Sequence, residues 1–172
     1  MFTASDRMPR KSNNDRSVLT GAIHFFRASD PMNRFDDVLA KFAKNRNSKG
    51  CTESEIVSLT PDDPEILPES YRKFLRVAGN GIDDFLTGSD FRVPELEGTR
   101  EAANQLLENS GLPPLPRHAF VFVMHQGFQF YYFDNESVYY FQEGWGAVKK
   151  SFDSFEHFFF SVVSRIEDKN RG

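Results

Sequence analysis

The stretch from Ala119 to Gln142 constrains the fold more than any other part of this sequence. It contains three runs of aromatic and β-branched residues, which lie at 119–125, 128–133 and 138–143. Two short polar breaks separate the runs, Gln126-Gly127 and then residues 134–137. Runs of this kind, broken by turn-forming residues, predict an antiparallel β-meander. Both faces of the predicted sheet are apolar, so helices should cover much of each face.

The expected turns fix which residues lie opposite each other in the meander. A two-residue turn at 126–127 pairs His125 with Phe128, and a loop over 134–137 pairs Phe133 with Val138. Because side chains alternate between the faces of a strand, one face should carry Val121, Val123, His125, Phe128, Phe130, Tyr132, Tyr139 and Phe141. The other should carry Phe120, Phe122, Met124, Gln129, Tyr131, Phe133, Val138, Tyr140 and Gln142. The glutamines and phenols make this second face the wetter one.

Helical patterns precede the meander. Apolar residues at i, i+3 and i+4 spacing predict an amphipathic helix from Pro31, with Asp30 as its N-cap and an end at 47–50. Thr52, followed three residues later by Glu55, is a capping box that opens a second, short helix. Further helices are expected to start at Pro68 and end at Ala78, to span Pro94–Asn109, and to run from a Ser151 cap to Ile166.

One or two short strands are expected around Gly88, in the apolar pairs Phe85-Leu86 and Phe91 with Val93, and another strand over 145–150. The expected fold class is therefore α+β, a central antiparallel meander wrapped by helices. With 19 Phe among 172 residues, the core should consist largely of aromatic rings.

The chain has the length of one domain. Residues 1–20 contain few large apolar side chains, so we expect a basic, flexible arm followed by a single domain over 21–172. Cys51 is the only cysteine, which excludes an intrachain disulfide. No apolar run is long enough to span a membrane, and the N-terminus lacks the apolar core of a secretion signal, so we expect a cytoplasmic protein without membrane contact.

Charge is unevenly distributed. Residues 1–50 hold 10 Lys and Arg against 5 Asp and Glu, whereas residues 51–172 hold 11 against 20. An acidic body repels phosphate backbones and attracts basic partners, so nucleic acid is an unfavourable partner and another protein a favourable one.

The sequence lacks the phosphate-binding, zinc-protease and serine-hydrolase motifs. The four histidines occur singly, and we predict neither a metal nor another cofactor. The acidic pairs Asp62-Asp63 and Asp83-Asp84 would form a catalytic carboxylate pair only if folding brought them together. Solvated loop charge is the alternative, and a hydrolase that uses these residues or His125 remains a competing hypothesis. Our prediction is that the protein is not an enzyme.

Four pieces of the sequence, in this order, resemble the SUKH superfamily in its Smi/Knr branch. They are Ile66-Leu67-Pro68-Glu69-Ser70-Tyr71-Arg72-Lys73-Phe74-Leu75, Asn80-Gly81, the meander with Gly127 and Val138-Tyr139, and Ser151-Phe152-Asp153-Ser154-Phe155. The resemblance spans about Met32 to Ile166. It implies a helix-wrapped antiparallel sheet that binds other proteins, and it supplies no catalytic residues.

Many bacterial members of that superfamily are immunity proteins that neutralise toxins, commonly nucleases, and fungal members are scaffolds in cell-wall signalling. The resemblance therefore predicts an immunity protein, with an intracellular regulatory scaffold as the alternative. Trp145, which lies between two glycines, is a candidate anchor for a partner, as are Tyr131 and Tyr140. Asp62, Asp63, Asp83 and Asp84 are the candidate charge contacts. Structural roles for these aromatic residues are an equally open alternative.

Overall fold

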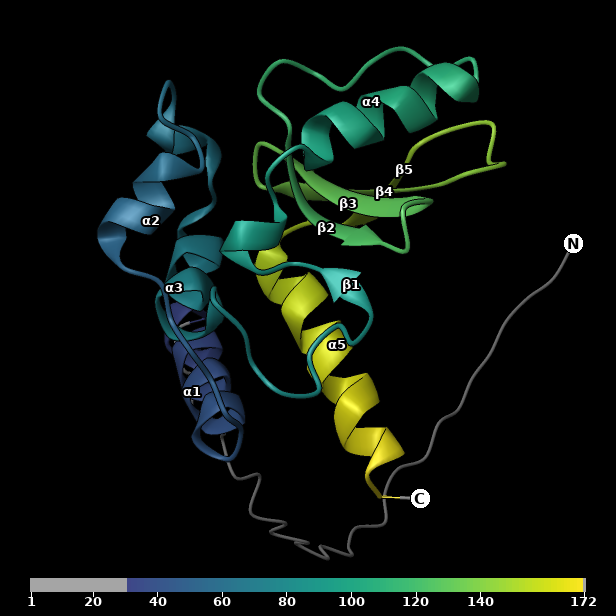
Figure 1. Ribbon diagram of the computed structural model, residues 1–172. Coiled ribbons are helices and arrows are strands. Elements are labelled where there is room, and N and C mark those ends of the chain that lie inside the picture. The colour runs from purple at the N-terminus through teal and green to yellow at the C-terminus, as the bar shows by residue number, and fades with distance from the viewer. Residues whose placement is uncertain (1–30, 172) are drawn as a thin grey trace, which may run out of the picture.

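The computed structural model describes residues 31–171, which form a five-stranded antiparallel sheet between two layers of helices (Figure 1). The strands are β1 (Ser89–Asp90), β2 (Phe120–His125), β3 (Gln129–Asp134), β4 (Ser137–Gln142) and β5 (Lys149–Phe152). The helices are α1 (Pro31–Lys44), α2 (Glu53–Ser58), α3 (Glu69–Ala78), α4 (Thr99–Asn109) and α5 (Phe155–Lys169), with 3₁₀ helices η1 (Pro64–Ile66) and η2 (Val93–Glu95). The strands follow one another in chain order across the sheet, so the predicted meander and α+β class are confirmed.

Both faces of the sheet are covered, as the apolar runs predicted. In Figure 1, α4 lies above the sheet and α5 below it, with α1, α2 and α3 to the left of α5. The Lys73 ammonium of α3 lies 2.8 Å from the Asp36 carboxylate of α1, which links these two helices. Within residues 31–171, no helix is both long and apolar enough to cross a membrane. The predicted basic arm at 1–20 lies outside the described residues, as does Asp30.

The larger core cluster lies between the sheet and helices α1, α3 and α5, and aromatic rings dominate it. Phe122 of β2 stacks on Phe133 of β3 with ring centroids 4.2 Å apart. Phe155 of α5 meets both rings edge-on, at 5.9 and 6.0 Å. Such pairs add about 0.5–1.5 kcal/mol each beyond the area they bury. The high phenylalanine content therefore stabilises the contact between the helices and this face of the sheet.

A second core cluster fills the space between α4 and the opposite face. It consists of Ala103, Leu106 and Leu107 from α4, Leu115 and Ala119 from the following segment, and Val121, Met124, Phe130, Tyr132 and Phe141 from the sheet. In Figure 1, α4 lies over this face, and the β5 residues Lys149, Lys150 and Ser151 at the edge of the sheet are exposed.

A β-bulge in β2 makes part of the predicted face assignment wrong. Val121 pairs with Tyr132, but the next paired residue is Val123, opposite Tyr131, so Phe122 is the extra residue of the strand. Beyond a bulge the alternation of side chains is reversed. Val123 therefore lies in the larger cluster and Met124 in the cluster under α4, the opposite of the prediction.

The turns of the meander differ from the predicted ones in length. His125 pairs with Gln129 and not with Phe128, so the first turn contains three residues. Gln126 (φ 50°) and Gly127 (φ 75°) both adopt left-handed conformations there. The predicted pairing of Phe133 with Val138 is confirmed, although Asp134 and Ser137 also pair and leave a turn of two residues.

The early helices form largely as predicted. In the capping box, the Thr52 amide donates to Glu55 Oε2 (2.7 Å) and the Glu55 amide donates to Thr52 Oγ1 (3.3 Å). Helix α3 begins after Pro68 and buries the predicted face, Tyr71, Phe74, Leu75 and Ala78. The helix predicted from Pro94 begins only at Thr99, because Gly98 (φ 75°) has a left-handed conformation that separates η2 from α4.

The prediction at Ser151 is wrong, and the one around Gly88 is partly wrong. Ser151 lies in β5 and does not cap a helix, since the backbone of Phe152 remains extended and pairs with Val138. The cap is Ser154, whose hydroxyl accepts a hydrogen bond from the His157 amide. Around Gly88, where one or two short strands were expected, one forms, the two-residue β1. Leu86 has φ +48° and belongs to a turn, so the pair Phe85-Leu86 forms no strand.

Candidate protein-binding surfaces

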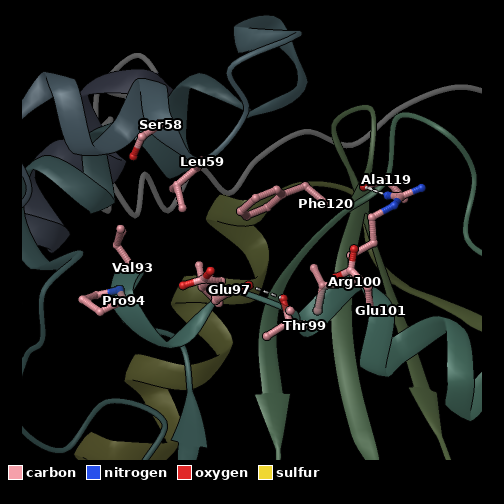
Figure 2. Close-up of a pocket in the computed structure, with 13 residues that line it drawn as sticks. Ser58, Leu59, Val93, Pro94, Glu97, Thr99, Arg100, Glu101, Ala119 and Phe120 are labelled. Carbon is pink, nitrogen blue, oxygen red and sulfur yellow. Dashed lines mark hydrogen bonds between the residues drawn. The ribbon is translucent and has the colours of Figure 1, made fainter.

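Two adjoining hollows lie where the segment after α2 meets the starts of α4 and β2, and Figure 2 shows the larger one. Their volumes are about 530 and 360 Å³. Both are lined by Leu59, Arg100, Ala119 and Phe120. We call the two hollows together the acid groove.

The walls of the acid groove are held by hydrogen bonds within the chain. The Arg100 guanidinium donates to the carbonyl oxygens of Ala119 and Pro116, the latter at 2.8 Å. It thereby ties the first turn of α4 to the segment that enters β2. The Thr99 hydroxyl donates to the Leu96 carbonyl (2.8 Å), which closes the turn before α4 (Figure 2). These bonds anchor the wall that α4 and the entry to β2 form, while Asp62 and Asp63 lie in the turn after α2.

Carboxylates outnumber cationic groups along the acid groove. The carboxylates are Asp62, Asp63, Glu97 and Glu101, and the guanidinium groups are Arg100 and Arg117. Asp63 lies 3.4 Å from His118, and both side chains are well exposed, so this contact contributes little to stability. In the described part of the chain, Asp62, Glu97 and Glu101 form no ion pair. Their charge is therefore available to a basic partner.

The two predicted acidic pairs do not come together. Asp62 and Asp63 line the acid groove, whereas Asp84 lines a different hollow beside Arg165 and Lys169 of α5. Asp83 accepts a hydrogen bond from the Asn47 amide (3.3 Å) and so helps to hold the chain after α1. The hollow that Asp84 lines and the hollow that Asp62 and Asp63 line share no residue. The structure therefore does not form the carboxylate pair that the hydrolase hypothesis requires.

The three predicted aromatic anchors do come together. Tyr131 and Tyr140 lie opposite each other on β3 and β4 with ring centroids 4.7 Å apart, and Trp145 meets Tyr140 edge-on at 5.2 Å. All three side chains are half-buried. We call these three residues the aromatic patch. Half-buried, clustered aromatic side chains of this kind suit both binding and packing.

Polar groups surround the aromatic patch, as expected of the wetter face. The Tyr140 hydroxyl donates to Gln129 Oε1 (2.7 Å) and lies 3.1 Å from Gln142 Oε1. The ammonium group of Lys149 lies 4.0 Å from the centre of the Trp145 ring, a cation–π contact. Burial raises the pKa of Tyr140, and the neighbouring Tyr131 raises it further. Both phenols therefore remain neutral hydrogen-bonding groups at physiological pH.

Sequence reasoning missed Glu97 and Glu101, which supply half of the carboxylates of the acid groove. Glu97 directly precedes Gly98, Glu101 follows three residues after it, and three glutamates occur within residues 95–101. This local excess of acid was a readable signal. Leu59, which directly follows α2, and Phe120, the first residue of β2, gave no signal, since a sequence does not reveal which apolar residues remain at a rim (Figure 2).

The other side chains that could carry chemistry, Cys51 and His125, have structural roles. Cys51 is buried, and burial raises the pKa of its thiol to about 11, opposite to the change that activates a nucleophile. His125 Nδ1 lies 2.8 Å from the Ser89 hydroxyl and so links β2 to β1. Among residues 31–171, no three His, Cys, Asp or Glu side chains are grouped so that they could hold a metal ion.

Comparison with known proteins gives one match. A family model described as SMI1 / KNR4 family (SUKH-1) matches residues 50–161, from just before α2 to the middle of α5, with all five strands included. No curated protein and no solved structure matches the chain.

Proposed function

Because the chain belongs to the SMI1/KNR4 family (SUKH-1), we propose that it is a non-catalytic protein-binding module that acts as an immunity protein. In this role it neutralises a cognate toxin, such as a nuclease, in the cytoplasm. The family match carries the proposal, and the charge and shape of the acid groove support it.

Charge favours a basic partner. A nuclease must attract a phosphate backbone, so its substrate path carries Lys and Arg side chains. The excess of acid over residues 51–172 would speed the encounter with such a surface. Asp62, Glu97 and Glu101, which form no ion pair among residues 31–171, would then pair with basic side chains of the toxin.

The shape of the acid groove suits side chains from a protein surface. Each hollow has room for a few side chains, and Leu59 and Phe120 provide apolar contact between the acidic rims. Asp62 and Asp63 thus remain our candidate charge contacts at this site. Asp83, Asp84 and the aromatic patch lie elsewhere, and we propose them as contacts of separate surfaces.

Co-expression with the products of adjacent reading frames tests the proposal. We expect one of them to be toxic alone, to be tolerated when this protein is present, and to form a complex with it. The double variant Asp62→Lys/Glu97→Lys should weaken that complex at least tenfold, mainly through slower association at low salt. Asp37→Lys, a reversal at an exposed residue of α1, is the control and should leave binding unchanged.

Two results would count against this function. If no adjacent product binds or is neutralised, the immunity role fails. If a toxin is bound but the groove variant and the α1 control behave alike, the role survives and the acid groove is not the contact surface.

The uneven charge of the sequence favours one alternative, a regulatory scaffold of the Smi/Knr cell-wall signalling type. A basic arm and an acidic body could contact two different proteins of the same cell. In that case the adjacent genes encode no toxin. Deleting residues 1–20 should then abolish one interaction and preserve the other, which pull-down experiments with both partners would detect.

A further inference from the structure

The outer edge of β5 (Lys149–Phe152) is a second surface suited to binding. β5 is the last strand of the sheet and pairs with β4 on one side. Among residues 31–171, no strand pairs with its other side, and Lys149, Lys150 and Ser151 are exposed. An edge of this kind presents main-chain N–H and C=O groups that an additional strand can bind. A register shift against β4 makes Ser151 an extra residue, so the regular part of this edge is at Lys149 and Lys150.

An apolar hollow of about 320 Å³ adjoins the start of this edge. Its walls include Leu107, Leu112, Pro114, Tyr132, Ala147 and Val148. Ala147 and Val148 come directly before β5, so a strand that continues along the edge would pass the mouth of the hollow. Strand addition gains its specificity from pockets that accept alternate side chains. The hollow is placed to accept one apolar side chain of an added strand.

The charge of the edge indicates which kind of strand would bind there. Although residues 51–172 are acidic overall, β5 carries Lys149 and Lys150 side by side. Lys149 lies over the Trp145 ring, and Lys150 lies 2.8 Å from Asp153. Lysines on an edge strand oppose pairing with a second copy of the same edge, because like charges would meet. Lys150 is paired with Asp153, but both side chains are exposed, so this pair contributes little and a strand that carries carboxylates is still favoured.

From these features we propose that the free edge of β5 binds an extended, acidic segment of a partner protein, which adds as a sixth strand and places an apolar side chain in the hollow at Ala147 and Val148. This surface differs from the acid groove in position and in charge preference. It is therefore independent of the immunity function and would hold equally for a scaffold.

A peptide probe tests the proposal with the full-length protein. The probe is a short, end-blocked, fluorescently labelled peptide that alternates glutamate with valine and carries leucine at each end. We expect saturable binding by fluorescence anisotropy, whereas a peptide with lysine in place of each glutamate should not bind. Two further peptides carry N-methyl groups on alternate residues, one peptide on the odd-numbered and the other on the even-numbered residues. In an added strand only every second N–H group points toward the sheet edge, so only one of these two peptides should lose binding.

Protein variants locate the site. Lys149→Glu/Lys150→Glu should weaken binding of the glutamate peptide about tenfold and should create binding of the lysine peptide. Lys41→Glu, an exposed residue of α1, changes charge far from β5 and is the control. The gain of lysine-peptide binding guards against a misfolded variant, since a protein that has lost its fold does not acquire a new specificity.

Three outcomes would overturn the proposal. The glutamate peptide fails to bind the full-length protein, or the double variant binds it as well as the wild type does, or both N-methylated peptides bind normally. Sedimentation velocity of the free protein tests whether a second copy of this chain occupies the edge instead. A dimer that the glutamate peptide dissociates would assign the edge to a second copy of this chain and would contradict the assignment to a partner.

Discussion

Replacing Tyr71 with phenylalanine should stabilise this protein. The Tyr71 ring is 1% exposed and lies at the centre of the larger core cluster, 5.0 Å from the Phe133 ring and 5.1 Å from the Phe155 ring. Its hydroxyl oxygen is buried and has no hydrogen-bond partner within residues 31–171. Burial raises the pKa of Tyr71, as expected for a phenol without contact with water. The hydroxyl has therefore lost its hydration without compensation.

The size of the effect follows from that lost hydration. A buried hydroxyl without a partner costs about 1–3 kcal/mol. Tyr71→Phe removes this cost and retains every ring contact. The void left by one oxygen atom and the lost dispersion contacts offset part of the gain. We expect a net increase of about 1 kcal/mol in the free energy of unfolding, or roughly 2–4 °C in melting temperature for a protein of this size.

Urea unfolding of the wild type, Tyr71→Phe and Tyr140→Phe measures the effect. Tyr140 is the matched control, because its hydroxyl donates to Gln129 and its loss should cost about 1 kcal/mol. The two conservative changes should therefore act in opposite directions. If Tyr71→Phe destabilises the protein as much as the control does, the Tyr71 hydroxyl has a partner and the reasoning fails.

Two further predictions concern the segment before and within α2. Because burial raises the pKa of the Cys51 thiol to about 11, the folded state disfavours the thiolate, and the free energy of unfolding should fall as pH rises from about 9 to 11. Cys51→Ala should reduce that slope in chemical denaturation at successive pH values, and equal slopes would contradict the assignment. Thr52→Ala removes the capping box and should lower stability by about 1 kcal/mol in urea unfolding, whereas the exposed Ser54→Ala should change little.

Most of the architecture was predictable because it depends on local signals. The alternation of apolar residues in the meander, the capping box at Thr52 and the Pro68 start of α3 each determine a structure within a few residues. The errors arose where two local signals compete. Ser151 and Ser154 both precede a phenylalanine, and only the pairing of Phe152 with Val138 decides which serine caps α5.

The bulge at Phe122 could not be predicted from the sequence for a different reason. Its sequence, Phe-Val-Phe-Val-Met, alternates in side-chain size but contains no polar residue that would show which side faces the solvent. When both faces are buried, either phase is compatible with the pattern, and packing against α4 and α5 decides. The candidate surfaces also differ in how far the sequence predicted them. Tyr131 and Tyr140 were predictable neighbours because they share one sheet face, whereas Trp145 comes from the loop between β4 and β5 and packs against the cluster under α4. The acid groove required segments that meet only in the fold.

The acid groove and the β5 edge should act independently of each other. The groove includes Phe120 of β2, and β3 and β4 separate this strand from β5. Three strand spacings amount to about 14 Å, beyond the screening length of about 8 Å at physiological ionic strength. Pro116, which accepts a hydrogen bond from Arg100, lines the hollow beside β5, but Asp62 and Glu97 do not. Substitutions this far apart, without shared contacts of their own, have additive effects. We therefore expect Asp62→Lys/Glu97→Lys to leave the affinity for the glutamate peptide within about twofold of wild type. A larger change in peptide affinity would mean that one partner spans both surfaces, and the two sites would then have to be treated as one interface.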